Sequence, residues 1–384
     1  MFRTLLTTAT SAYLIAFCLT VPGAAQDKDP ARLLRDEGSL KNPMELKLLP
    51  SKTSSIYKAE KGGWQFNLHS YITYYDGKFW AIWSSGRVDE DSPSQGIRYA
   101  TSKDGHSWSE SQMLAPDPDG PEGLGRWIAR GIFVDGGKLY ALTAYMEGGT
   151  DVGKRREAWH NLRLMRWVWT GSAWRDMGLY LTNCMNNYPP RLLNKKLFMT
   201  CRDSFMQTYA AIAEPSASPK WTTKPLPGTV DHRFDEPTWH IATDGTVHMI
   251  IRDGTRSRYL LRSVSKDNGN TWPEPVRTNY PDATSKNFTG KLSNGWYFLI
   301  NNPNQNGRDP LAISFSQDGW VFDHPAALRK GAPARRFEGR SKGSGSIQYP
   351  HAIEKDGSLW VIYSTNKEDI EISQFKIADF GLGK

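Results

Sequence analysis

Two side chains that are far apart in this sequence could together attack an anomeric carbon. Glu236 lies in Asp235-Glu236-Pro237-Thr238, and Tyr349 lies in Ser346-Ile347-Gln348-Tyr349-Pro350-His351. A phenol with an ordinary pKa of about 10 needs a neighbouring carboxylate to accept its proton before it becomes a nucleophile. Such a tyrosine is an exception to the paired-carboxylate scheme of glycoside cleavage, and it avoids repulsion from an anionic sugar. The alternative is a packed aromatic residue and a carboxylate that is satisfied by Arg252.

Arginines supply the charge that an anionic ligand needs. Arg252 comes 16 residues after Glu236, and Arg308 lies in Gly307-Arg308-Asp309. Because a guanidinium group binds a carboxylate with two parallel hydrogen bonds, Arg252 and Arg308 predict an anionic substrate. They could instead pair with the adjacent Asp253 and Asp309. Further candidates for substrate binding are Arg87, Arg130, Arg202 and Asn67.

Proton transfer could involve His69 or an acidic loop. Imidazole titrates near neutral pH, so His69 is a candidate general acid or base, although a lone strand histidine is also a common structural residue. The run Asp89-Glu90-Asp91 follows Arg87. Like charges raise a carboxyl pKa, which would suit Asp89 or Asp91 as a proton donor. A solvated acidic loop or a calcium-binding rim is the alternative for this run.

Aromatic residues are abundant enough to line a sugar-binding cleft. The chain has 15 tryptophans, and Trp127 and Trp239 are our candidates for stacking on sugar faces. Tyr188, followed by Arg191 and Arg202, is the phenol that a lyase would use. No recognised metal-ligand spacing is present, so we expect no cofactor, although a structural divalent cation is conceivable.

A turn motif recurs along the chain. Its full form is Ser265-Lys266-Asp267-Asn268-Gly269-Asn270-Thr271-Trp272, and shorter forms occupy 102–108 and 316–322. The aspartate can accept backbone N–H groups, the glycine can adopt a positive φ, and the tryptophan can cover the turn. Aromatic anchors that follow turn-rich stretches are separated by 66, 47, 51 and 50 residues: Trp108, Trp174, Trp221, Trp272 and Phe322.

Short strands lie between these anchors, at 71–75, 79–84, 139–144, 247–252, 296–301 and 359–363. They are rich in β-branched and aromatic residues and have turn signals on both sides. A period near 50 residues with four short strands predicts an all-β chain that folds as a β-propeller. Six blades fit best and seven are possible. The last blade would combine 359–363 and 370–375 with a strand from the N-terminus.

The ends of the chain suggest export. Residues 1–25 read as a signal peptide, and no later apolar run is long enough to span a membrane, so we expect a secreted or periplasmic protein without membrane insertion. Residues 26–61 would be a lead-in that wraps the outside, residues 62–384 a single propeller domain, and residues 329–345 a long rim loop. Export allows Cys184 and Cys201 to pair, although two free thiols fit the sequence equally well.

The charge favours an anionic partner. Arg3 is the one charged residue in 1–25, so the net charge of +8 becomes +7 after cleavage. This suits an acidic oligosaccharide, polysaccharide or glycoconjugate. Nucleic acid is not expected, because the basic residues are scattered and no recognition motif is visible.

The turn motif is what is called the Asp-box or BNR repeat, and most of the mature chain resembles the sialidase superfamily of propellers. This resemblance implies that Glu236 and Arg252 correspond to the sialidase glutamate and second arginine, and that Arg308 corresponds to the third. It also implies that Tyr349 is the nucleophile and that the 89–91 loop holds the acid/base aspartate.

The first blade departs from this pattern. Sialidases open it with a Phe-Arg-Ile-Pro type motif, whereas this chain has Phe66-Asn67-Leu68-His69-Ser70-Tyr71, with Asn67 in place of the arginine. With His69 on the same strand, the segment is loosely similar to propeller enzymes of acidic glycans, namely rhamnose-glucuronate hydrolases and lyases and ulvan lyases. We therefore expect a sialidase-like hydrolase, with a lyase or rhamnosidase-like enzyme using His69, or a non-catalytic glycan-binding propeller, as alternatives.

Overall fold

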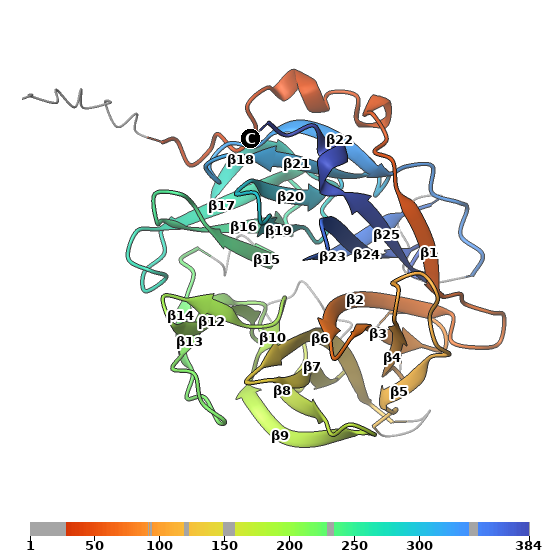
Figure 1. Ribbon diagram of the computed structural model, residues 1–384. Coiled ribbons are helices and arrows are strands. Elements are labelled where there is room, and N and C mark those ends of the chain that lie inside the picture. The colour runs from red at the N-terminus through yellow and green to blue at the C-terminus, as the bar shows by residue number, and fades with distance from the viewer. Residues whose placement is uncertain are drawn as a thin grey trace, which may run out of the picture.

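Six antiparallel β-sheets surround a common axis in the computed structural model (Figure 1). The structure describes residues 28–383 except 91, 93, 119–122, 149–157, 229–233 and 338–344. The predicted signal peptide therefore lies outside the described residues. Within the described part of the chain each sheet is one blade of a propeller, so the prediction of six blades is confirmed.

In blades 1 to 5 the strands follow one another along the chain, whereas blade 6 also takes in the N-terminal strand. Blade 1 contains β2 (Phe66–Tyr75), β3 (Lys78–Gly86), β4 (Gly96–Ser102) and β5 (Gln112–Ala115). Blade 2 contains β6 (Gly125–Asp135), β7 (Lys138–Glu147), β8 (His160–Trp169) and β9 (Trp174–Thr182). Blade 3 contains β10 (Met185–Asn186), β11 (Arg191–Leu193), β12 (Lys196–Arg202), β13 (Thr208–Ala213) and β14 (Thr222–Pro225). Both β10 and β11 pair with β12, so together they form a split inner strand.

The remaining blades complete the ring. Blade 4 contains β15 (Phe234–Ile241), β16 (Val247–Asp253), β17 (Tyr259–Ser265) and β18 (Val276–Pro281). Blade 5 contains β19 (Phe288–Lys291), β20 (Tyr297–Asn301), β21 (Leu311–Ser316) and β22 (Asp323–Arg329). Blade 6 contains β23 (Ile347–Lys355), β24 (Ser358–Thr365), β25 (Asp369–Lys376) and β1 (Lys52–Tyr57). The first strand of each blade lies nearest the axis in Figure 1, except in blade 6, where β23 does.

The N-terminal strand closes the ring. Strand β1 pairs antiparallel with β25, and Lys52 lies opposite Gln374. Before β1, the chain runs along the outside of blade 5 through two short 3-10 helices, η1 (Glu37–Leu40) and η2 (Pro43–Glu45). Isolated bridges join Leu34 to Phe322 and Leu48 to Ala327. The expected N-terminal closing strand is thus confirmed, and it comes from the segment that was predicted as a lead-in.

The repeated turns have the expected hydrogen bonds. In the 265–272 turn, Asp267 Oδ1 accepts from Thr271 N at 2.9 Å, and Trp272 Nε1 donates to the Gly269 carbonyl at 3.0 Å. Gly269 has a φ of 80°, and a Cβ on it would lie 2.8 Å from the ring of Phe198 in the preceding blade. The turn therefore needs glycine both for its conformation and for contact between blades.

All five aromatic anchors stand at the same place in their blades. Each lies between the third and fourth strands or is the first residue of the fourth, as Trp174 is in β9. Several of them fill the space between blades, for example Trp221, whose ring lies edge-on to Tyr180 at 5.4 Å. The 50-residue spacing therefore reports the blade repeat.

Cys184 and Cys201 form a disulfide with a Cα–Cα distance of 5.4 Å, which settles the choice between a bond and two free thiols. Both lie in the core of blade 3 and are buried. Among the described residues, no helix has the length and apolarity to cross a membrane. Nor does any cluster of three or more His, Cys, Asp or Glu residues in that part of the chain have the arrangement of a metal site.

Candidate active site

Three of the predicted reactive residues occupy the same unusual backbone position. His69 in β2, Glu236 in β15 and Tyr349 in β23 have φ values of 54°, 43° and 60°. In each strand the pairing register shifts at this point, which marks a β-bulge. Non-glycine residues rarely adopt positive φ, and bulges redirect a side chain relative to its strand. Backbone strain of this kind is concentrated at functional sites.

One nitrogen atom brings the predicted nucleophile and base together. Arg252 Nη1 donates to Glu236 Oε2 at 2.5 Å and to the Tyr349 hydroxyl at 3.2 Å. The same nitrogen lies 3.7 Å from Asp235 Oδ2, and Arg202 forms an ion pair with the other Asp235 oxygen. Phenol, carboxylate and guanidinium therefore form one contiguous group, to which blades 6 and 4 contribute.

The electrostatic surroundings set the protonation of this group. Burial opposes ionisation of Glu236, but the positive charges of Arg252 and Arg202 outweigh it and hold the pKa of Glu236 below its usual range. Burial, and then the negative charge of Glu236, raises the pKa of the Tyr349 phenol. Tyr349 is therefore a neutral phenol next to an ionised carboxylate, which is the starting state that a base-assisted nucleophile requires.

His69 joins this group from blade 1. Its ring lies edge-on to that of Tyr349, with centroids 5.2 Å apart. Burial lowers the pKa of His69 far below its usual value, and the charges of Arg130 and Lys286 lower it further. Nδ1 of His69 is buried and has no hydrogen-bond partner within the described residues. His69 is thus a neutral imidazole, and its lowered pKa makes it a weaker proton acceptor than an ordinary histidine.

Arg308 and Arg130 also lie in this group, as the sequence predicted. The Arg308 guanidinium lies 5.5 Å from the centre of the Tyr349 ring, and its Nη2 donates to the Thr284 carbonyl at 2.9 Å. The charge of Arg130 acts on His69 and Tyr349. Arg87 is placed differently, because it is exposed and stacks on the ring of Trp64 at 4.3 Å.

Lys286 also belongs to the group, although no sequence pattern pointed to it. It precedes β19 and is 1% exposed. Its ammonium donates to the Tyr71 hydroxyl at 2.8 Å and to the Asn187 carbonyl at 3.1 Å. It also lies 4.3 Å from the centre of the Tyr188 ring and 5.9 Å from that of Tyr349. A single lysine in a loop has no spacing pattern, so only the packing of four blades reveals it.

In the acidic loop after β3, the structure shows the contacts of Glu90 and Asp89. Glu90 forms an ion pair with Lys367. Burial opposes ionisation of Glu90, but Lys367 and Arg308 lower its pKa overall, so it lies within electrostatic reach of the axis. Asp89 is half-buried and accepts a hydrogen bond from Ser92. Asp91 lies outside the described residues.

Asn67 and the two chosen tryptophans are placed away from this group. Asn67 Nδ2 donates to the carbonyls of Trp64 and Glu368, and its Oδ1 accepts from Trp83 and Ser85, which leaves no polar atom for a ligand. Asn67 therefore joins blade 1 to blade 6 and does not replace the missing arginine.

Trp239 packs between blades, whereas Trp127 packs within blade 2. Trp239 is 4% exposed, stacks under Arg191 at 4.2 Å and lies 4.7 Å from the ring of Phe198. Its ring is therefore covered on the faces that a sugar would need. Trp127 lies edge-on to Tyr145 at 5.3 Å in blade 2. The burial of Trp239 argues against sugar stacking there, whereas Trp127 is only partly buried and its role in sugar stacking stays a prediction.

Tyr188 is held by backbone carbonyls. Its hydroxyl donates to Asn287 O at 2.5 Å and lies 3.2 Å from Pro350 O. Burial raises its pKa well above the usual value. It lines a cavity of about 430 Å³ together with Phe288 and His351. Its hydroxyl proton is thus already committed, which disfavours proton transfer to a substrate.

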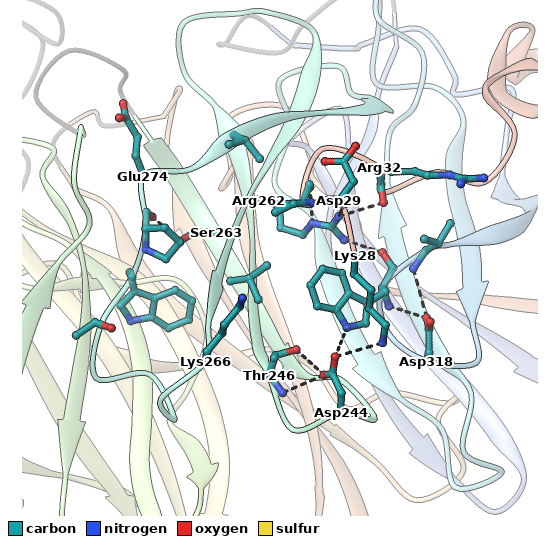
Figure 2. A pocket seen from close by; sticks show the side chains of 18 of the residues that line it. Lys28, Asp29, Arg32, Asp244, Thr246, Arg262, Ser263, Lys266, Glu274 and Asp318 are labelled. Atoms are coloured by element: carbon teal, nitrogen blue, oxygen red, sulfur yellow. Dashed lines mark hydrogen bonds and ion pairs between the residues drawn. The ribbon is translucent and has the colours of Figure 1, made fainter. Parts of the chain in front are cut away.

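A much larger cavity, of about 1390 Å³, lies outside the axial group, between residues 28–35 and blades 4 and 5. Figure 2 shows that several of its charged residues, among them Asp244, Arg262 and Asp318, bond to neighbouring residues. Lys28 pairs with Asp244 at 3.2 Å, and Arg262 donates to the Asp29 carbonyl at 2.8 Å. This cavity anchors the N-terminal segment to the propeller, and none of the predicted catalytic residues lines it.

The fold and the site define a six-bladed propeller with a tyrosine, glutamate and arginine group at its axis. Residues 77–361 match the family model of the BNR repeat-like domain, and the chain therefore belongs to that family. No curated protein matches the chain.

Solved structures share the fold at low sequence identity. A sialidase has 20% identity over 86% of this chain, with a TM-score of 0.61. The sialidase of Trypanosoma rangeli in complex with sialic acid has 15% identity over 87% of this chain, with a TM-score of 0.59. This chain covers 33% and 59% of the lengths of those two chains. A protein of unknown function from Dyadobacter fermentans has 12% identity over 85% of this chain and 98% of its own, with a TM-score of 0.65. These likenesses establish a sialidase-type fold.

Proposed function

We propose that this protein hydrolyses a glycosidic bond at or next to an acidic sugar, either a sialic or a uronic acid. The observation that carries the proposal is the contact of Arg252 Nη1 with both Glu236 and Tyr349. The phenol and the ionised carboxylate share this guanidinium nitrogen as a donor, and in the proposed reaction the carboxylate takes the phenolic proton while the phenol attacks. The sialic acid bound to the Trypanosoma rangeli sialidase is consistent with this substrate class.

In the proposed reaction, Glu236 accepts the phenolic proton as the Tyr349 oxygen bonds to the anomeric carbon and the glycosidic bond breaks. A carboxylic acid of the 89–91 loop gives its proton to the leaving oxygen. Water then attacks the anomeric carbon and gives one proton to the loop carboxylate, the bond to the tyrosine oxygen breaks, and Glu236 returns its proton to the phenolate. Arg252 and Arg308 hold the sugar carboxylate, since Nε of each is a donor without a partner among the described residues.

The basic axis suits an anionic ligand. Arg130, Arg202, Arg252, Lys286 and Arg308 are all buried or nearly so. Positive charges in a low-dielectric channel attract anions strongly and repel cationic competitors. We extend the proposal to export of the mature chain, with acidic oligosaccharides, polysaccharides or glycoconjugates outside the cytoplasm as its substrates.

A second candidate function is a uronate-directed lyase that uses His69. This candidate is favoured by the unpartnered Nδ1 of His69 and by Asn67 in place of the first-blade arginine. The imidazole would remove the proton next to the uronate carboxylate, and the bond to the leaving oxygen would break with formation of a carbon–carbon double bond. His69 is neutral, but its lowered pKa weakens it as a base and ranks this candidate below hydrolysis.

Product chemistry separates these functions. The purified protein is incubated with sialosides, rhamnosyl glucuronides and ulvan, and both new reducing ends and ultraviolet absorbance are followed. A hydrolase yields reducing ends without absorbance, whereas a lyase yields an unsaturated uronate that absorbs. If neither signal appears while an acidic glycan binds, the protein is a glycan-binding propeller and the proposal fails.

A further inference from the structure

The charges at the axis divide into those that are paired and those that are not. Among the described residues, four ion pairs are formed there: Arg252 pairs with Glu236 and with Asp235, Arg202 pairs with Asp235, and Lys367 pairs with Glu90. Arg130 and Lys286 have no ion-pair partner within the described residues. Glu236 acts on both at longer range, but its carboxylate already contacts Arg252. Two buried positive charges therefore lack a counter-ion of their own.

Arg130 is the more exceptional of the two. Its side chain is 1% exposed, and neither Nε nor Nη1 has a hydrogen-bond partner among the described residues. The Arg130 guanidinium does bond to the Tyr71 hydroxyl, but a buried guanidinium with no ion-pair partner and two nitrogens unsatisfied is still disfavoured. Such a group in a folded protein calls for an ordered ligand that supplies the missing acceptors.

Lys286 lies beside Arg130. The Lys286 ammonium bonds to the neutral oxygens of Tyr71 and Asn187, which do not cancel its charge. The positive charge of Arg130 lowers the pKa of Lys286, as does burial, and Arg130 also acts directly on the Tyr71 hydroxyl. Both cations thus converge on the Tyr71 hydroxyl, which itself donates to Asn187 O at 2.7 Å.

Neutral donors flank these two cations in the sequence. Ser70 Oγ stands between His69 and Tyr71, and Ser285 Oγ and Asn287 Nδ2 stand on either side of Lys286. All three are buried without a hydrogen-bond partner in the described part of the chain. Unsatisfied donors from blades 1 and 5 therefore accompany the two unpaired charges.

We propose that Arg130 and Lys286 form a binding site for a small inorganic anion, of the size and charge of chloride, in the buried group that contains Tyr349 and Glu236. An anion there would accept hydrogen bonds from Arg130 and offset two charges that are otherwise uncompensated. The near-complete burial of Arg130 favours a monatomic ion over a sugar carboxylate, which would meet Arg252 first because that side chain is 14% exposed. The site does not depend on the proposed hydrolysis.

Bromide provides a direct test, because it mimics chloride and scatters X-rays anomalously. Crystals of the unmodified protein, prepared without other halides and soaked in sodium bromide, should show an anomalous peak within hydrogen-bond distance of Arg130. A map with no peak beside Arg130 overturns the proposal. This measurement does not require any variant to fold.

Thermal unfolding gives an independent readout. At constant ionic strength, replacing sodium gluconate by sodium bromide should raise the Tm, because an ion that binds the folded state stabilises it. The rise should grow with bromide concentration up to about 100 times the Kd and be absent in Arg130→Met. Arg87→Met is the matched control, since Arg87 is exposed and should leave the bromide effect intact. Equal bromide effects in the unmodified protein and Arg130→Met would contradict the assignment.

Discussion

Replacing Tyr349 by phenylalanine removes one oxygen atom and tests the proposed nucleophile. The lost oxygen accepts a single hydrogen bond, from Arg252 Nη1 at 3.2 Å, and that nitrogen keeps its 2.5 Å bond to Glu236. The ring keeps its edge contact with His69 and its position beside Arg308. A hydrogen bond to a charged group contributes about 1.5–3 kcal/mol. Because Arg252 Nη1 keeps its bond to Glu236, we expect the loss of stability to lie near the lower end of this range.

The expected loss of activity is far larger. Without the phenolic oxygen no covalent intermediate can form, and removal of a nucleophile that acts together with its base costs several orders of magnitude in kcat, here at least about 10³-fold. Release of reducing ends from the best substrate measures the rate, and thermal unfolding by circular dichroism measures stability. Rate and stability should therefore separate sharply in this variant.

Tyr280→Phe is the matched control. Tyr280 is also fully buried, and its hydroxyl lies 2.6 Å from Ser314 Oγ, in blades 4 and 5. The control should lose similar stability and keep its rate. The nucleophile assignment is refuted if Tyr349→Phe keeps more than about a tenth of the unmodified rate, which is far above the residual expected without the nucleophile.

Four further outcomes are expected. His69→Ala should leave the release of reducing ends within about tenfold of the unmodified rate, because His69 is not the acid or base of the proposed hydrolysis and a residue in that role contributes more than tenfold. If the variant instead loses an ultraviolet-absorbing product, the protein is a lyase. Trp239→Ala should cost about 3–5 kcal/mol in denaturant unfolding with little change in KM, because its ring fills the core. Replacing Cys184 and Cys201 by serine opens a loop with a sequence separation of 17 and should cost about 3 kcal/mol in the same assay. Burial raises the pKa of Asp282 to about 6, so the folded state binds this proton more tightly than the unfolded state; the stability of the unmodified protein relative to Asp282→Asn should be highest below pH 4 and fall by about 3 kcal/mol as the pH rises through 6.

The fold was predictable because its signals are local. Each Asp-box turn places an aspartate, a glycine and a tryptophan within eight residues, and their hydrogen bonds close within the turn. The spacing of the turns along the chain then predicts the number of blades. Closure by β1 was also foreseeable, since the C-terminal blade lacked a fourth strand.

The site was predictable only in part. Glu236, Arg252, Arg308 and Tyr349 were found because each stands in a recognisable pattern, and three of them are in direct contact through Arg252. Lys286 could not be found, since its surroundings come from blades 1, 3 and 6. Asn67, Trp127 and Trp239 were assigned by residue type alone, and type does not report which side of a strand faces the neighbouring blade.

The inner strands show why these residues converge on one group. In an ordinary strand, successive side chains alternate between the two faces of the sheet, and both faces of an inner strand meet neighbouring blades. The positive φ at His69, Glu236 and Tyr349 breaks that alternation in blades 1, 4 and 6. Each bulge turns one side chain out of the inter-blade core toward the axis. The strain is tolerated because the surrounding sheets fix both sides of each bulge.

This arrangement makes the geometry of the site depend on closure of the ring. Tyr349 comes from β23, whose sheet is completed by β1 at its outer edge. His69 comes from the adjoining blade 1, and Asn67 ties that blade to blade 6 through the Glu368 carbonyl at 2.7 Å. The 5.2 Å ring contact between His69 and Tyr349 spans this seam. Asn67, which replaces the arginine of the sialidase motif, therefore contributes to the site by joining blade 1 to blade 6 and not by contact with a ligand.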